Sequence, residues 1–171
     1  VHENTNWKRK HLGTLSHAYS KKPFGKEAIE PIKEVFALQI PNLMELNIHL
    51  IKLFCAKLNI TTRFIRSSEL NISSKRSNRL IEFCQHFNCK AYLSPRGAKG
   101  YIEEDGILKQ SSIEIHYQNF NPKPYPQGGS ATFVSHLSIV DLVANLGWEA
   151  ARTYIREKNC ASLPDNKSSD L

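Results

Sequence analysis

Three short segments of β-type sequence lie in the middle of this chain, and they constrain its fold more than any other feature. Residues 60–66 are rich in β-branched side chains, residues 90–94 read as a short strand with an apolar centre, and residues 112–118 alternate apolar with polar side chains. A helical pattern over residues 73–88 separates the first two, and a crossover separates the last two. Because such an order produces parallel pairing, the pattern predicts an α/β fold: a Rossmann-like, mainly parallel sheet of at least three strands, packed with helices.

Helical patterns flank this region, at residues 7–22, 26–37, 43–58, 137–147 and 149–156. In the second of them, Pro31 has to lie in or near the first turn or else kink the helix. Asn42 is the predicted N-cap of the third, which is apolar nearly all round and is therefore expected to be buried. We expect a single α/β domain over residues 1–157 and a flexible C-terminal tail over residues 158–171.

Composition narrows the class of protein. With 40% hydrophobic and 23% charged residues in 171, the chain can build a core. It contains neither a run of roughly 20 apolar residues, as a membrane span needs, nor an apolar signal region at its start. We therefore expect a cytoplasmic protein without a membrane span. No metal site is predicted, because the four cysteines form no C-x-x-C pair. Reduced, structural thiols at Cys55 and Cys84 are favoured over two disulfides in a secreted domain.

The positive charge is concentrated near the predicted strands. The net charge is +7, and residues 60–100 alone carry eight basic and two acidic residues, a local charge of +6. In parallel sheets ligands bind beyond the carboxyl ends of the strands. Serine and glycine there also form ordinary turns and caps, but three polar ends in a basic region favour a site for a phosphate or carboxylate. The candidate ligand-binding residues at these ends are Arg66, Ser67, Ser68, Ser94, Arg96, Gly97, Lys99, Tyr101 and Gln118.

Four further residues complete the candidate set. We expect Arg79 to point from the first turn of its helix toward the serines of the first strand end; alternatively it only pairs with Glu82. Tyr125 and Gln127 lie in a proline-rich loop that either holds them over the site or is a stiff connector. Asp141 is included as a ligand-binding residue, although an exposed first-turn acid favoured by the helix dipole is the simpler interpretation. No catalytic residue and no cofactor is assigned, because the common phosphate-loop, dinucleotide, zinc-protease and hydrolase motifs are absent.

An ordered set of blocks carries a family resemblance. The blocks are Trp7-Lys8-x-Lys10-His11, Ala18-Tyr19-x-Lys21-x-Pro23, Ser67-Ser68-x-Leu70, Arg79-Leu80-Ile81, Tyr92-Leu93-Ser94, Gly97, Tyr101, Tyr117-Gln118-x-Phe120, Tyr125-Pro126-Gln127 and Leu137-Ser138-Ile139-Val140-Asp141. In order and spacing, over roughly residues 7–155, the chain resembles the WbqC-like protein family. The family's leading motif, of Gln-Pro and Tyr-Leu-Pro-Trp type, has no counterpart here. We therefore expect about the first third of the family pattern to be missing and the resemblance to cover its C-terminal two thirds. Ala144 stands where the family pattern has Phe.

The resemblance implies a bacterial origin and a link to surface-polysaccharide synthesis, including the O-antigen of lipopolysaccharide. We consider three alternative functions for the chain. The first is a biosynthetic transferase or ligase acting on an anionic small molecule, such as a nucleotide-linked sugar, or on a small amino-acid acceptor. The second is a non-catalytic scaffold of a polysaccharide assembly. The third is a basic nucleic-acid-binding module, which is disfavoured because the C-terminal third, with six basic and nine acidic residues, is acidic.

Overall fold

The computed structural model describes residues 6–129 and 132–157. The chain divides into two compact units: unit 1 comprises Val1–Thr62 and Pro122–Arg156, and unit 2 comprises Arg63–Asn121 and Glu157–Leu171. Each unit has a hydrophobic core of its own. The predicted C-terminal tail, residues 158–171, lies outside the described residues.

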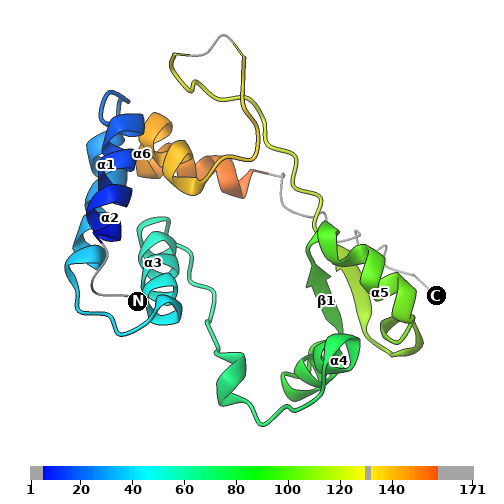
Figure 1. The fold of residues 1–171 in the computed structure, drawn as a ribbon. Coiled ribbons are helices and arrows are strands. Elements are labelled where there is room, and N and C mark those ends of the chain that lie inside the picture. Colours follow the sequence, from blue (N-terminus) through cyan, green and yellow to red (C-terminus); the bar gives the residue numbers. More distant parts are fainter. Residues whose placement is uncertain (1–5, 130–131, 158–171) are drawn as a thin grey trace. The chain divides into compact units, whose positions relative to one another are not determined.

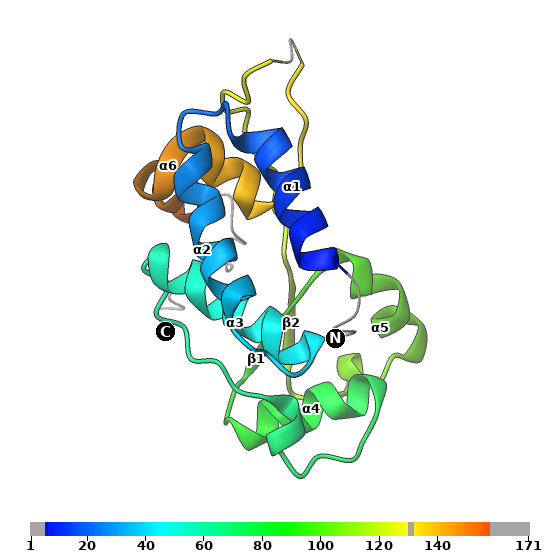
Figure 2. The same cartoon turned by 60° about the vertical axis from the view of Figure 1, so that its left-hand side comes forward.

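Unit 1 is helical. Its helices are α1 (Trp7–Tyr19), α2 (Gly25–Ala37), α3 (Leu43–Lys57) and α6 (Ile139–Arg156). The four confirm the helical patterns read from the sequence. Helix α2 packs against α1, α3 and α6 (Figures 1 and 2), and its buried face consists mainly of aliphatic side chains at helical spacing. Pro31 lies inside α2 and is buried, rather than in the first turn. The core joins this face to the apolar side of α6.

Helix α6 is interrupted where the sequence predicts a helix end. Gly147 has φ 78° and ψ 172°, a conformation that glycine adopts more easily than any residue with a Cβ. A Cβ at this position would also lie 3.1 Å from the Phe24 ring. The backbone N–H of Phe24 donates to the carbonyl of Ala144 over 2.9 Å, which fixes the α1–α2 turn on α6. The small Ala144 is completely buried at this contact.

Helix α3 differs in part from expectation. Its predicted cap is confirmed, since the Asn42 side chain accepts a hydrogen bond from the N–H of Glu45 over 2.9 Å. The expected burial of the whole helix is wrong: Leu46 and Phe54 are buried, whereas Leu43 is 59% exposed. The physical reason is that α3 packs mainly on α2 and, through Phe54, on Trp148 of α6, and an apolar sequence does not say how many of a helix's faces are covered.

Unit 2 contains the sheet. Its elements are the 3-10 turn η1 (Ser67–Glu69), helix α4 (Arg76–His86), strand β1 (Ala91–Ser94), the 3-10 turn η2 (Arg96–Ala98), helix α5 (Lys99–Asp105), the 3-10 turn η3 (Leu108–Gln110) and strand β2 (Glu114–Tyr117). Strands β1 and β2 pair in parallel, as the sequence predicts. Their core of Cys84, Ile102, Leu108 and Ile113 lies among α4, α5 and the strands.

The predicted Rossmann-like sheet of at least three strands is wrong. Among the described residues the sheet has two strands, and most helices of the chain belong to the separate helical unit. Residues 60–66 form no strand, and Phe64 and Ile65 are 47% and 39% exposed. A β-branched run becomes a strand only when a neighbouring strand takes up its backbone hydrogen bonds, and these residues instead connect α3 to η1. No described helix is long and apolar enough to cross a membrane.

Candidate functional site

The carboxyl edge of the parallel pair in unit 2 brings several predicted residues together. The register places Ser94 beside Tyr117, the last residue of each strand. The backbone N–H of Gln118 then donates to the Ser94 carbonyl over 2.8 Å, so the two predicted residues are neighbours. The Ser94 side chain is fully buried, and its hydroxyl donates to the carbonyl of Pro95 over 3.3 Å. Ser94 therefore shapes the edge, while Gln118 is exposed on it.

Lys99 and Tyr101 lie on the same edge, at the start of α5. The Lys99 ammonium is 5.8 Å from the centroid of the Tyr117 ring and 3.8 Å from the Glu103 carboxylate. Burial raises the pKa of Tyr117, and the nearby Glu103 and Tyr101 raise it further. Tyr101 also contributes, after burial, to the raised pKa of Tyr92 on β1. The edge therefore combines a cation with the phenols of Tyr117 and Tyr92, whose raised pKa values favour the neutral form. Glu103 offsets part of the positive charge of this edge.

Turn η2 carries the remaining basic group of this edge. Arg96 and Gly97 follow β1 directly and are exposed. The Arg96 guanidinium has no ion-pair partner among the residues that the structure describes. An exposed guanidinium can bind a carboxylate or phosphate with two parallel hydrogen bonds. We define the strand-edge site as Ser94, Arg96, Lys99, Tyr101 and Gln118.

The residues expected at the first strand end have another setting, because that strand does not form. Ser67 and Ser68 are exposed in η1, and Arg66 lies 3.8 Å from the Glu69 carboxylate in the same turn. Arg79 is the fourth residue of α4. Its guanidinium carbon lies 5.5 Å from the centroid of the Phe83 ring. Within the described ranges Arg79 makes neither the Glu82 pair nor a bond to the serines, and its Nε is buried without a partner. Its role in anion binding stays a prediction.

The other predicted residues meet in unit 1, around Asp141. The Tyr125 hydroxyl donates to Asp141 Oδ2 over 2.7 Å, and the Gln127 amide lies 3.5 Å from the same oxygen. Asp141 is 5% exposed, so the interpretation as an exposed first-turn acid is wrong: the proline-rich loop covers it. The Asp141 N–H donates to the carbonyl of Ser138. The hydroxyl of Ser138 accepts a hydrogen bond from the N–H of Val140 over 3.2 Å and so caps α6. Burial, and after it the hydrogen bond to Asp141, raise the pKa of Tyr125 to about 12.

Gln127 closes the loop on itself. Its amide donates to the carbonyl of Val134 and accepts from the N–H of Val134, both over 2.8 Å. The Lys22 ammonium, from the α1–α2 turn, donates to the carbonyls of Gln127 and Gly128. The hydrogen-bonding groups of the Gln127 side chain are therefore occupied, and this residue positions the loop. We define the Asp141 network as Tyr19, Lys22, Tyr125, Gln127 and Asp141.

Two members of this network, Tyr19 and Lys22, are absent from the candidates predicted from the sequence. Burial raises the pKa of Tyr19, and the charge of Asp141 and a hydrogen bond between the phenol and Asp141 raise it further. Tyr19 belongs to one of the blocks that carry the family resemblance, and Lys22 lies between two matched positions of that block. The block Ala18-Tyr19-x-Lys21-x-Pro23 was therefore the signal from which these two residues could have been predicted. The strand-edge site belongs to unit 2 and the Asp141 network to unit 1, so a site shared by the proline-rich loop and Ser67 stays a prediction.

The described residues contain no group of three or more His, Cys, Asp or Glu side chains placed to hold a metal ion. Cys55, Cys84 and Cys89 are free thiols; Cys84 is buried in the core of unit 2, where burial raises its pKa. Cys160 lies outside the described residues.

The chain belongs to the WbqC-like protein family, whose model matches residues 1–153, which is most of the chain and not only its C-terminal two thirds. It is similar to the uncharacterized protein Rv1507c of Mycobacterium tuberculosis, with 28% identity over 152 residues. The alignment covers 86% of this chain and 64% of the relative, so the chain spans less than two thirds of the curated relative's length. No solved structure matches the chain.

Proposed function

We propose that this WbqC-like protein is a cytoplasmic transferase or ligase of bacterial surface-polysaccharide (O-antigen) synthesis, which acts on a nucleotide-linked sugar or on a small amino-acid acceptor. Membership of the family supports the link to polysaccharide synthesis, through the resemblance described above. The observation that carries the proposal is the strand-edge site, where the carboxyl ends of two parallel strands present basic and amide groups.

The chemistry of the strand-edge site suits a diphosphate. Arg96 supplies a fork of N–H donors, Lys99 supplies a point charge, and Gln118 supplies an amide that can bind a sugar hydroxyl or a phosphate oxygen. All three are exposed and lie on neighbouring segments that β1 and β2 hold in register. Burial raises the pKa of Tyr117 beside them, so this phenol stays neutral and adds no negative charge that would repel the ligand.

Titration calorimetry with uridine diphosphate and with inorganic pyrophosphate tests this proposal. We expect both to bind the full chain, and the double variant Arg96→Gln/Lys99→Gln to bind at least about tenfold more weakly. The control is Lys109→Gln: Lys109 lies in η3, before β2, at the other end of the strands, so the variant loses one cation elsewhere in unit 2. Because the control removes one charge and the double variant two, a control that loses half as much binding free energy as the double variant would mean that only the net charge matters.

A second titration distinguishes the alternatives. Duplex DNA at two salt concentrations is expected to bind weakly or not at all. Steeply salt-dependent DNA binding without diphosphate binding would refute the proposal in favour of a nucleic-acid-binding module. Failure to bind uridine diphosphate, pyrophosphate and DNA alike would favour the non-catalytic scaffold.

A further inference from the structure

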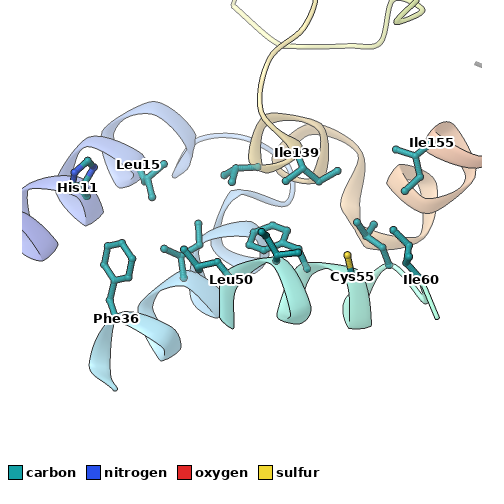
Figure 3. Close-up of a pocket in the computed structure, with 13 residues that line it drawn as sticks. His11, Leu15, Phe36, Leu50, Cys55, Ile60, Ile139 and Ile155 are labelled. Carbon is teal, nitrogen blue, oxygen red and sulfur yellow. The ribbon is translucent and has the colours of Figure 1, made fainter. Parts of the chain in front are cut away.

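Unit 1 contains a cavity of about 550 Å³ that neither candidate site uses. It lies among α1, α2, α3 and α6, and Figure 3 shows side chains of α1 and α6 facing those of α2 and α3 across it. Its volume is within the range of about 300–1,000 Å³ that is typical of small-molecule sites. Because every lining residue belongs to unit 1, the cavity is a property of that unit alone.

The lining is apolar except at two positions. Aliphatic and aromatic side chains form nearly all of it, and the exceptions are the imidazole of His11 and the thiol of Cys55. A sugar, a nucleotide or an amino acid would lose its hydrogen bonds to water here without replacing them, which is strongly unfavourable for each polar group. The cavity therefore excludes the polar ligands proposed for the strand edge and suits a hydrocarbon chain.

The two polar side chains lie at different places along the cavity. In Figure 3, His11 lies with Leu15 and Phe36 at one end, and Cys55 lies near Ile60 toward the other. His11 is exposed to solvent, so the end that it lines opens to water. Cys55 is half-buried and lies in the part of the cavity that is otherwise lined by apolar side chains.

A cation is fixed beside the His11 end. Lys8 lies one helical turn before His11, and its ammonium donates to the carbonyls of Phe36 over 2.7 Å and of Leu38 over 3.2 Å. These two bonds hold the charge next to Phe36 and leave a third ammonium hydrogen for a ligand. Together with the imidazole, this gives two donors, which matches the two oxygens of a carboxylate. Residues 1–22, with five basic and one acidic residue, make this the more positive end of unit 1's sequence.

We propose that this cavity binds a long-chain monocarboxylate, with the hydrocarbon chain between the helices and the carboxylate at Lys8 and His11. Burial of the chain supplies the affinity, and the rim cation sets the direction in which the ligand enters. The site is separate from the strand-edge site and does not depend on the proposed function.

Titration of the full chain with octanoate, decanoate and dodecanoate, below their micelle concentrations, tests the proposal. We expect each added pair of methylenes to tighten binding about tenfold, and dodecylamine to bind at least about tenfold more weakly than dodecanoate, because its ammonium would face the cation. Trp7 lies 5.7 Å from the His11 ring and 5.2 Å from the Phe36 ring, so its fluorescence reports on this end. The absence of a chain-length dependence would overturn the proposal.

Two matched pairs of variants locate the ligand. Ile51 and Met44 are both 52% exposed on α3, but only Ile51 lines the cavity. Ile51→Trp should therefore weaken dodecanoate binding at least about tenfold by narrowing the cavity, and Met44→Trp should not. His11→Gln should weaken it, whereas His17→Gln, an exposed change on the same helix, should leave it unchanged.

Thiol protection provides an independent measurement. Bound dodecanoate should slow alkylation of Cys55 without slowing that of the exposed Cys89, which lies in unit 2. If the ligand protects neither thiol, or if the variants within each pair behave alike, the cavity is not the binding site. If the chain elutes as a dimer that Ile51→Trp dissociates, a second copy covers this face and the proposal is wrong.

Discussion

Tyr125→Phe isolates one hydrogen bond of the Asp141 network. The Tyr125 ring packs edge-on against Phe133 and Tyr154, at centroid distances of 5.2 and 5.5 Å, and phenylalanine keeps both contacts. Only the hydroxyl is lost, and with it the 2.7 Å bond to the buried Asp141 carboxylate. Hydrogen bonds to charged groups contribute about 1.5–3 kcal/mol. Because the Tyr125 side chain is only half-buried, we expect the low end, a loss of about 1.5 kcal/mol.

Tryptophan fluorescence during urea unfolding measures this loss in the right unit. Both tryptophans of the chain, Trp7 and Trp148, belong to unit 1. The transition therefore reports the unfolding of unit 1 without a contribution from unit 2. Tyr154→Phe is the matched control, because the Tyr154 hydroxyl donates to an exposed backbone carbonyl, that of Lys123, over 2.7 Å. We expect this control to lose less than about 1 kcal/mol.

The pH dependence of the difference provides a second criterion. The pKa of Tyr125 is about 12 in the folded protein, against an ordinary value of 10. Between these values only the unfolded chain releases the proton, so the hydroxyl's contribution is complete below pH 10 and falls as the pH rises toward 12. The difference in unfolding free energy between wild type and Tyr125→Phe should therefore shrink over this range. A difference that stays constant, or a loss at pH 7 no larger than that of Tyr154→Phe, would refute the reasoning.

Two further predictions concern a buried contact in each unit: a close backbone approach in unit 1 and a hydrogen bond in unit 2. Gly25→Ala should destabilise unit 1 by about 3 kcal/mol or more, since a Cβ there would lie 1.7 Å from the Tyr19 carbonyl oxygen. Gly13→Ala should instead stabilise unit 1 by roughly 0.5–1 kcal/mol, because a Cβ at Gly13 would have no atom within 4 Å. Urea unfolding of the two variants measures both changes. Ser77→Ala should cost unit 2 about 1–3 kcal/mol, because the fully buried hydroxyl donates to Asp105 over 2.6 Å. Amide exchange should show faster opening of α4 in this variant, and an unchanged rate would contradict the assignment.

Local sequence patterns predicted the elements that depend on neighbouring residues. The helices, the Asn42 cap, the break at Gly147 and the two paired strands follow from periodicity, cap chemistry and β-propensity within short windows. Residues 60–66 have equally strong propensity but form no strand, because pairing depends on a partner elsewhere in the chain. The three-stranded sheet could not be judged from these residues alone.

The candidate site residues also divide into features that local sequence predicts and features that depend on distant parts of the chain. The strand-edge residues that follow β1 and β2 were predictable, since parallel pairing by itself places Ser94 beside Gln118. The burial of Asp141 was not, because it results from a loop folding back over α6 from 14 to 16 residues earlier in the chain. Periodicity reports which face of α6 is apolar, but it does not report which loop covers the first turn.

The hydrogen bonds of the Asp141 network favour a positioning role over a catalytic one. The Gln127 amide is hydrogen-bonded to the backbone of Val134, and the Lys22 ammonium is hydrogen-bonded to carbonyls of the same loop. A group whose donors and acceptors are already engaged gains little from a ligand, because each new bond replaces an existing one. At the strand edge, by contrast, Arg96 and Gln118 are exposed to solvent. Loss of the Tyr125 hydroxyl should therefore lower the stability of unit 1 while leaving diphosphate binding unchanged, and Arg96→Gln/Lys99→Gln should do the reverse.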